Sequence, residues 1–283
     1  MNLHTNRSTE MNLPQKISAV FTELRSKKQT AFIPFIPAGD PNLNATGSII
    51  SALPRAGADL IEIGFPFSDP IADGPVIQAA YTRALNQGIR VESIFEMIHH
   101  LSSKPGWKTP LVGMVSYSLV FRPGVSKFLT RANQSGLSGL IVPDLPIDEA
   151  EELSAAVREH HLDLIMLVSP LTPIDRAAKI AKYSSGFLYC VSTVGITGER
   201  TELPSSLQAQ LKSIRELTSL PLCIGFGISQ PSQVQRWKEY ADGLIVGSAI
   251  VRRLEKANEI GMDSAQSEIV EFVQEFSREC KIR

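Results

Sequence analysis

Eight short apolar runs recur along the chain, and segments with the periodicity of amphipathic helices separate them. The runs are Ala31–Pro37, Asp59–Gly64, Pro110–Ser116, Ser138–Asp144, Asp163–Ser169, Gly186–Ser192, Pro221–Gly227 and Asp242–Ser248. Each is rich in Val, Ile, Leu and Phe, which is typical of strands that are covered on both faces, as in a parallel sheet. This alternation restricts the chain to the parallel α/β architectures.

Helical patterns fill the intervals between the runs, and glycine and proline mark the joints. They span Leu43–Ala56, Val76–Asn86, Val125–Ser135, Asp148–His160, Ile174–Ser184, Leu207–Leu217 and Ala249–Lys256. Eight such units without a linker predict a single (β/α)8 TIM barrel over residues 13–283. An open, doubly wound sheet is the alternative, but AFIPFIPAGDP lacks the GxGxxG of its dinucleotide-binding form. Additional helices are predicted at Gln15–Lys27, Val91–Ser102 and Ser264–Glu279, the last closing the ring.

The composition excludes several classes of partner. With 28 basic and 29 acidic residues and no basic stripe, the chain is not expected to bind nucleic acid. No apolar stretch approaches the roughly 20 residues of a membrane span, and the polar start MNLHTNRSTE has no apolar signal core. We therefore expect a soluble, cytoplasmic protein with a disordered leader at residues 1–12.

Cysteine and histidine give no sign of a disulfide framework or a metal site. Cys190, Cys223 and Cys280 lack CxxC spacing, and inert buried thiols are the simpler interpretation. The histidines are His4 and two adjacent pairs at positions 99–100 and 160–161. Neighbours on a helix point in different directions, so neither pair shares a face and no metal ligands are predicted.

The second apolar run carries the most informative polar residue. Side chains alternate along a strand, so Glu62 shares a face with Leu60 and Gly64. Near the C-terminal end of a barrel strand, such a carboxylate points into the mouth, where burial raises its pKa toward the range of general acid–base catalysis. A structural ion pair is the alternative, but none of the eight runs contains Lys or Arg.

The loop after this run contains a second candidate acid, Asp73. It stands before Gly-Pro at the start of the Val76–Asn86 helix, so it fits a helix cap and a site residue equally well. Asp69, between Ser and Pro, is an ordinary turn residue.

Glycine-bearing loops after the last runs predict a phosphate site. Gly225-Phe226-Gly227 and Gly247-Ser248 each precede a helical segment, whose free N–H groups attract an anion. Loops after strands seven and eight of barrels often bind phosphate, and the loop of residues 194–198 supplies a third glycine-rich edge.

Other residues in or next to the apolar runs argue against two types of catalytic chemistry. Tyr189 lies in a strand-like run, where core packing is more common than substrate contact. Ser192 and Thr193 have no matching His and Asp for a triad. The absence of lysine from the runs argues against a Schiff-base aldolase, so any C–C bond chemistry would rely on proton transfer.

Five segments resemble the α subunit of tryptophan synthase, and the similarity covers nearly the whole chain after Met11. They are FIPFIPAGDP, IEIGFPFSDPIADGPVIQ, VSTVGITG, GFGIS and IVGSAIV. The resemblance implies a lyase of tryptophan biosynthesis that cleaves indole-3-glycerol phosphate to indole and glyceraldehyde 3-phosphate without a cofactor. It also implies a β subunit that carries pyridoxal phosphate, receives the indole in an α2β2 heterotetramer and contacts residues such as Pro66–Pro70.

The resemblance also implies residue roles. Glu62 matches the catalytic acid and base, and Asp73 matches the carboxylate that binds the indole N–H. The implied substrate-binding residues are Phe35, Tyr189, Thr197 and Phe226, and the implied phosphate-binding residues are Gly198, Gly227, Gly247 and Ser248. Thr197 would position Asp73 when the loop closes.

Two positions depart from the family pattern and affect fine pocket contacts. Family members commonly carry asparagine where Ser118 stands, and some carry arginine in the Ser192-Thr193-Val194 segment. Two alternatives share the motifs: a free-standing indole-3-glycerol phosphate lyase, and a non-catalytic phosphate-binding barrel. A different phosphate-binding barrel enzyme is a third, although a metal-using epimerase would need histidines on its strands.

Overall fold

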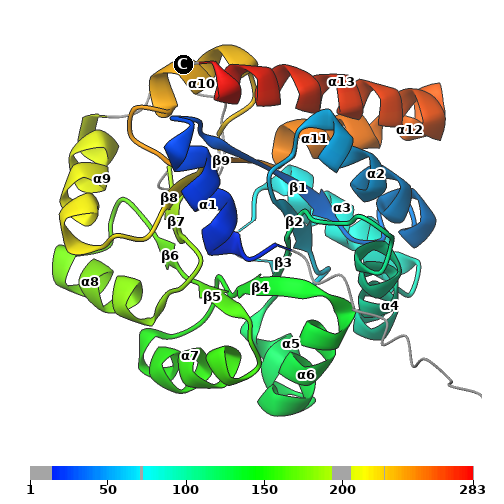
Figure 1. The fold of residues 1–283 in the computed structure, drawn as a ribbon. Helices are drawn as coiled ribbons and strands as arrows, with labels where there is room; N and C mark the ends of the chain where they lie inside the picture. The colour runs from blue at the N-terminus through cyan, green and yellow to red at the C-terminus, as the bar shows by residue number, and fades with distance from the viewer. Residues whose placement is uncertain (1–14, 71–72, 193–204, 226, 283) are drawn as a thin grey trace, which may run out of the picture.

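The chain forms a ring of parallel strands surrounded by helices in the computed structural model (Figure 1). The structure describes residues 15–70, 73–192, 205–225 and 227–282. Its strands are β1 (Ala31–Pro37), β2 (Ile61–Gly64), β3 (Leu111–Met114), β4 (Leu137–Ile141), β5 (Asp163–Ile165), β6 (Leu167–Val168), β7 (Leu188–Val191), β8 (Leu222–Gly225) and β9 (Gly243–Val246). They are ordered β5-β4-β3-β2-β1-β9-β8-β7-β6.

The ring has nine strands because the fifth predicted strand is divided at Met166. β5 pairs with β4, β6 pairs with β7, and only Met166 separates the two along the chain. The Met166 carbonyl accepts a hydrogen bond from the Tyr189 N–H, so the backbone itself carries the sheet around the division. The predicted barrel is therefore confirmed as eight β/α units, with β7, β8 and β9 as the sixth, seventh and eighth apolar runs.

Helices form the outer layer. They are α1 (Ile17–Ser26), α2 (Leu43–Ala56), α3 (Pro75–Asn86), α4 (Val91–Ser102), α5 (Tyr117–Phe121), α6 (Val125–Ser135), α7 (Ala150–Glu159), α8 (Ile174–Tyr183), α9 (Ser205–Leu217), α10 (Val234–Trp237), α11 (Ser248–Glu255), α12 (Ala257–Ile260) and α13 (Met262–Lys281), with 3-10 turns η1 (Ile147–Glu149) and η2 (Pro231–Gln233). The bounds of α2, α4 and α6 are those predicted, while α5, α10 and α12 are short helices that the periodicity did not reveal. None of the helices in the described residues is long and apolar enough to span a membrane.

Two apolar cores hold the layers together. The larger fills the space between the strands and the outer helices, and it includes Ile61 and Ile63. The smaller fills the barrel and includes Leu60 and Phe187. Since alternate residues of one strand enter different cores, the side-chain direction predicted for β2 is confirmed.

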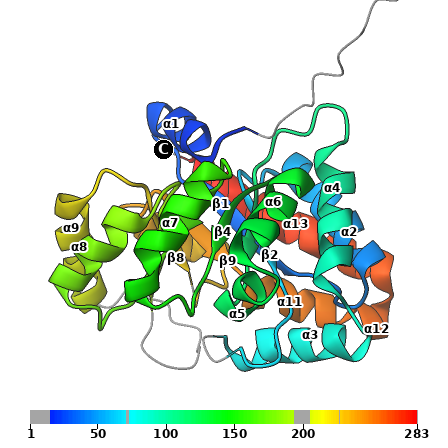
Figure 2. The same cartoon turned by 90° about the horizontal axis from the view of Figure 1, so that it is seen from below.

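The first helix closes one end of the barrel. Its buried face includes Val20 and Phe21, which belong to the interior core, and the Phe21 ring lies 5.9 Å from the Phe187 ring. In Figure 2, α1 lies at one end of the molecule and α3 at the opposite end. Because α3 follows the C-terminal end of β2, the functional site belongs at the end away from α1.

Candidate active site

Glu62 projects from β2 into the barrel. In the sheet register it lies beside Phe35 of β1 and Val112 of β3, both of which belong to the interior core. Only 1% of Glu62 is exposed. Both of its carboxyl oxygens are buried without a hydrogen-bond partner in the described structure. The alternative of a structural ion pair is therefore excluded within the described residues.

Burial controls the protonation of Glu62. Desolvation is the larger cause, and the charge of Asp73 adds to it, so that the pKa of Glu62 rises from 4.5 to about 8. An isolated carboxylate would be costly here, whereas a protonated carboxyl is tolerated. At neutral pH Glu62 consequently carries a proton that it can donate.

Asp73 does not cap α3, which removes the ambiguity left by the sequence. The helix begins at Pro75, its N-cap residue is Gly74, and no side chain makes a capping hydrogen bond there. Burial raises the pKa of Asp73 from 3.8 to about 6. Asp73 is therefore mostly ionised at neutral pH, when Glu62 is still protonated.

The two carboxylates line one cavity at the C-terminal end of the barrel. Seven of the predicted site residues line it: Phe35, Glu62, Asp73, Tyr189, Gly227, Gly247 and Ser248. The predicted residues Thr197, Gly198 and Phe226 lie outside the described residues. The structure thus brings together every predicted site residue that it describes.

One end of the cavity is formed by the loops after β8 and β9, where the sequence predicts phosphate binding. Gly227 has a φ of +77°, a conformation that glycine adopts readily and other residues do not. Gly247 is the N-cap of α11, and the first N–H groups of that helix, beginning at Ser248, have no acceptor within it. This arrangement directs backbone donors at an anion.

Two buried tyrosines flank the carboxylates. A Cβ at Gly225 would lie 2.1 Å from the Tyr189 hydroxyl oxygen, so the missing side chain makes room for the phenol. Burial, followed by the charges of the two acids, raises the pKa of both Tyr189 and Tyr81 well above its usual value. Both phenols therefore stay neutral. Tyr81 lies on α3 and was not predicted as a site residue.

Sequence reasoning also missed half of the cavity wall. The additional lining residues are Ile77, Met114, Ile228, Ser229, Ile245, Ala249 and Arg252. Met114 and Ile245 lie near the C-terminal ends of strands, a position that could have marked them. The helix residues Ile77 and Arg252 carry no such signal, because their place depends on how α3 and α11 pack.

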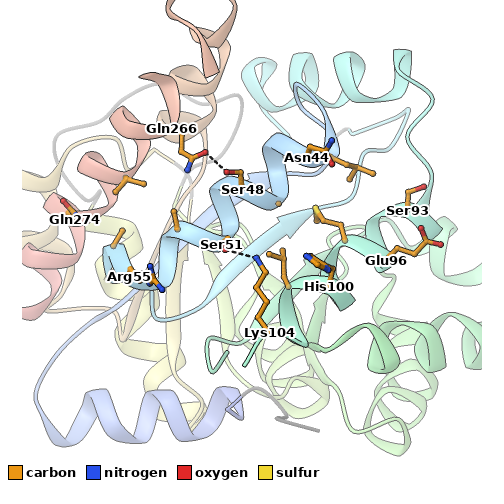
Figure 3. A pocket seen from close by; sticks show the side chains of 17 residues that line it. Asn44, Ser48, Ser51, Arg55, Ser93, Glu96, His100, Lys104, Gln266 and Gln274 are labelled. Carbon is orange, nitrogen blue, oxygen red and sulfur yellow. Dashed lines mark hydrogen bonds between the residues drawn. The ribbon is translucent and has the colours of Figure 1, made fainter. Parts of the chain in front are cut away.

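A larger groove on the outer surface has ordinary surface chemistry. It runs along α2 between α4 and α13 (Figure 3). Its polar side chains bond to one another: Lys104 donates to the Ser51 hydroxyl at 3.0 Å, and the Ser48 hydroxyl donates to Gln266 at 2.8 Å. The groove presents no buried acid, so the barrel mouth is the better candidate for catalysis.

Comparison with known sequences gives a consistent family. The family model described as tryptophan synthase alpha chain matches residues 21–281. The chain is 49% identical to a tryptophan synthase alpha chain of Rhodopirellula baltica, over 89% of this chain and 92% of the relative. It is 42% identical to that of Microcystis aeruginosa, over 94% and 97% of the two chains.

Solved structures agree with the sequence relatives. A tryptophan synthase structure from Mycobacterium tuberculosis is similar with a TM-score of 0.84 and 32% identity, covering 95% of this chain and all of that one. The tryptophan synthase subunit alpha of Legionella pneumophila reaches a TM-score of 0.85 at 31% identity, covering 94% and 98%. The chain belongs to the tryptophan synthase alpha chain family.

Proposed function

We propose that Glu62 and Asp73 carry the acid–base steps by which this lyase cleaves indole-3-glycerol phosphate to indole and glyceraldehyde 3-phosphate. The strongest support for this assignment is that two acids with pKa values of about 8 and about 6 face the same cavity. Acid–base pairs in enzymes are often carboxyl groups whose surroundings separate their pKa values in this way.

The proposed reaction balances without a cofactor. Protonated Glu62 donates its proton to indole C3, and the positive charge that develops on the indole ring is stabilised by ionised Asp73 at the ring N–H. The Glu62 carboxylate then removes the proton of the hydroxyl on the carbon attached to C3. The C–C bond electrons return to the indole ring, the aldehyde of glyceraldehyde 3-phosphate forms, and Glu62 is protonated again.

The remaining predicted residues have binding roles in this proposal. Phe35 and Tyr189 contact the indole end, while Gly227, Gly247 and Ser248 hold the phosphate. The roles of Thr197, Gly198 and Phe226, which would complete the loop and the phosphate cradle, stay predictions. The apolar wall and the buried tyrosines exclude water, which strengthens the electrostatic contribution of both acids.

The chain acts in tryptophan biosynthesis with a β subunit that receives the indole. The family match favours this reading over a free-standing lyase or a non-catalytic barrel. We further propose that residues 13–283 form one domain and that residues 1–12 are a leader. In the proposed complex, residues Pro66–Pro70 contact the β subunit. The complex is an α2β2 heterotetramer in the cytoplasm.

An assay of indole release from indole-3-glycerol phosphate tests the assignment. Glu62→Gln keeps the shape but cannot exchange the proton, so kcat should fall by about 10²–10⁴-fold. Asp73→Asn removes the charge at the ring N–H and should lower kcat by about 10²–10³-fold. Glu96→Gln, on the outer groove, is the matched control and should leave kcat unchanged.

Unchanged turnover in a folded Glu62→Gln protein would show that the catalytic assignment is wrong. Circular dichroism of each variant separates this outcome from unfolding.

A further inference from the structure

The wall of the active-site cavity contains a single lysine or arginine within the described residues, Arg252. The same wall contains the carboxyl groups of Glu62 and Asp73. A phosphate monoester carries a charge of about −1.5 to −2 at neutral pH. Backbone amides give it hydrogen bonds but no net charge, so an anionic substrate would enter a cavity in which ionised Asp73 repels it.

The position of Arg252 on α11 suits it to reach the phosphate end. It lies four residues after Ser248, and residues at this spacing share a helix face. Helical side chains also lean toward the N-terminus of their helix, and Arg252 lines the same cavity as Gly247 and Ser248.

Arg252 is also available to bind a ligand. In the part of the chain that the structure describes, no hydrogen bond or ion pair involves its guanidinium. Neighbouring arginines are engaged: Arg83 bonds to Asp40 and Glu255, while Arg253 stacks 3.7 Å from the Phe272 ring centroid.

A second polar group on the cavity wall lacks a hydrogen-bond partner among the described residues. The Ser229 hydroxyl oxygen is buried without a hydrogen-bond partner among the described residues, and Ser229 lines the cavity two residues after Gly227. A buried hydroxyl without a partner costs free energy that a bound phosphate oxygen would recover.

We propose that Arg252 is a specificity-determining residue, which pairs with the phosphate of the substrate and selects a phosphorylated indole-glycerol over an uncharged one. The assignment rests on the proposed function, because it concerns the substrate of that same cavity. The phosphate is remote from the bond that breaks, so Arg252 acts on binding equally in the ground state and the transition state. Its loss should raise KM and leave kcat nearly unchanged.

The test compares two substrates in the complex with the β subunit. For Arg252→Gln, kcat/KM for indole-3-glycerol phosphate should fall about tenfold, the lower end expected for a charge-assisted hydrogen bond that is partly open to solvent. For indole-glycerol, which lacks the phosphate, kcat/KM should not change. Arg252→Lys should recover part of the lost kcat/KM for indole-3-glycerol phosphate. High salt should reduce the difference in this kcat/KM between Arg252→Gln and the unmodified protein.

Arg131→Gln on α6 is the matched control, since Arg131 is exposed and outside the cavity, and it should behave as the unmodified protein. If Arg252→Gln lost the same factor in kcat/KM with both substrates, or lost none with either, the proposed role of Arg252 would be wrong.

A separate measurement distinguishes failure of this inference from failure of the proposed function. Binding of inorganic phosphate and glycerol 3-phosphate, followed by calorimetry, does not depend on turnover. If the unmodified protein binds these anions and Arg252→Gln binds them about tenfold more weakly, the role of Arg252 holds even if indole-3-glycerol phosphate is not cleaved. If both proteins bind them equally, the role of Arg252 is refuted whatever the activity.

Discussion

Glu62 and Asp73 belong to the same β/α unit, but their surroundings differ. Glu62 stands inside a strand, on the cavity wall and beside interior side chains, and its pKa rises to about 8. Asp73 follows in the loop above it, and its pKa rises only to about 6. Between these values the pair holds one proton, on the residue that must donate it. This distribution is the state that the proposed mechanism requires.

The first prediction at this scale concerns the pH dependence of activity. As pH rises through about 6, Asp73 ionises and kcat/KM should increase; as pH rises through about 8, Glu62 loses its proton and kcat/KM should decrease. A pH profile of indole release should therefore be bell-shaped. The substrate phosphate also titrates near pH 6, so an acid limb that persists in Asp73→Asn would belong to the substrate.

The second prediction concerns stability. Because burial raises the pKa of Glu62, the folded state holds the proton more tightly than the unfolded chain. Stability from this group is fully present below pH 4.5 and is lost as pH rises through about 8. Glu62→Gln does not titrate, so it should be more stable than the unmodified protein above pH 8, by up to about 5 kcal/mol at 1.36 kcal/mol per pKa unit.

Urea unfolding at pH 5 and at pH 9 measures this difference. If the difference in free energy of unfolding between the two proteins were the same at both pH values, burial would not raise the pKa of Glu62. A variant that loses activity and gains stability would mark Glu62 as a residue kept for function.

At the scale of elements, one arginine ties together three parts of the barrel that form the site. Arg83 of α3 donates two hydrogen bonds to Asp40, in the loop after β1, and a third to Glu255 of α11. These elements carry Phe35, Ile77 and Ser248 on the cavity wall. Asp40 is only 2% exposed and forms an ion pair with Arg83.

Removing this contact should destabilise the protein. Arg83→Met keeps most of the aliphatic packing but leaves the buried Asp40 carboxylate without its cation. The free energy of unfolding should fall by about 1–3 kcal/mol, less than for a fully buried pair because a third of the Arg83 side chain is exposed. Guanidinium unfolding measures it, with Arg131→Met on α6 as the control. An equal effect in both variants would show that the contact with Asp40 contributes nothing.

At the scale of the whole molecule, the two ends of the barrel differ in structure. α1 fills one end with apolar side chains, while the opposite end holds the cavity and the loops after the strands. Stability and catalysis are therefore separated along the barrel axis. In the proposed complex, the β subunit contacts the loop end, where indole leaves the cavity.

The corresponding prediction is that the β subunit activates this chain. Titrating the β subunit into a fixed concentration of this chain should raise the rate of indole release by at least about tenfold, which corresponds to an activation free energy lower by about 1.4 kcal/mol. The rate is measured with indole-3-glycerol phosphate at saturating concentration. Full activity of this chain alone would contradict dependence on the partner and favour a free-standing lyase.

The sequence by itself determined the order of the β/α units and the direction in which Glu62 points. Both follow from local rules: apolar runs of strand length, helical periodicity and the alternation of side chains along a strand. These rules act within a few residues, so they predicted the bounds of α2, α4 and α6. They also marked Glu62, Gly227, Gly247 and Ser248 as candidates, whereas the roles of Phe35, Asp73 and Tyr189 came from the resemblance to the family.

Only the tertiary structure decided the properties that depend on distant neighbours. It separated the pKa values of Glu62 and Asp73, showed that Gly74 rather than Asp73 is the N-cap of α3, divided the fifth strand at Met166, and brought Arg252 to the cavity wall. Burial and charge arise from side chains far apart in the chain, and no local pattern encodes them.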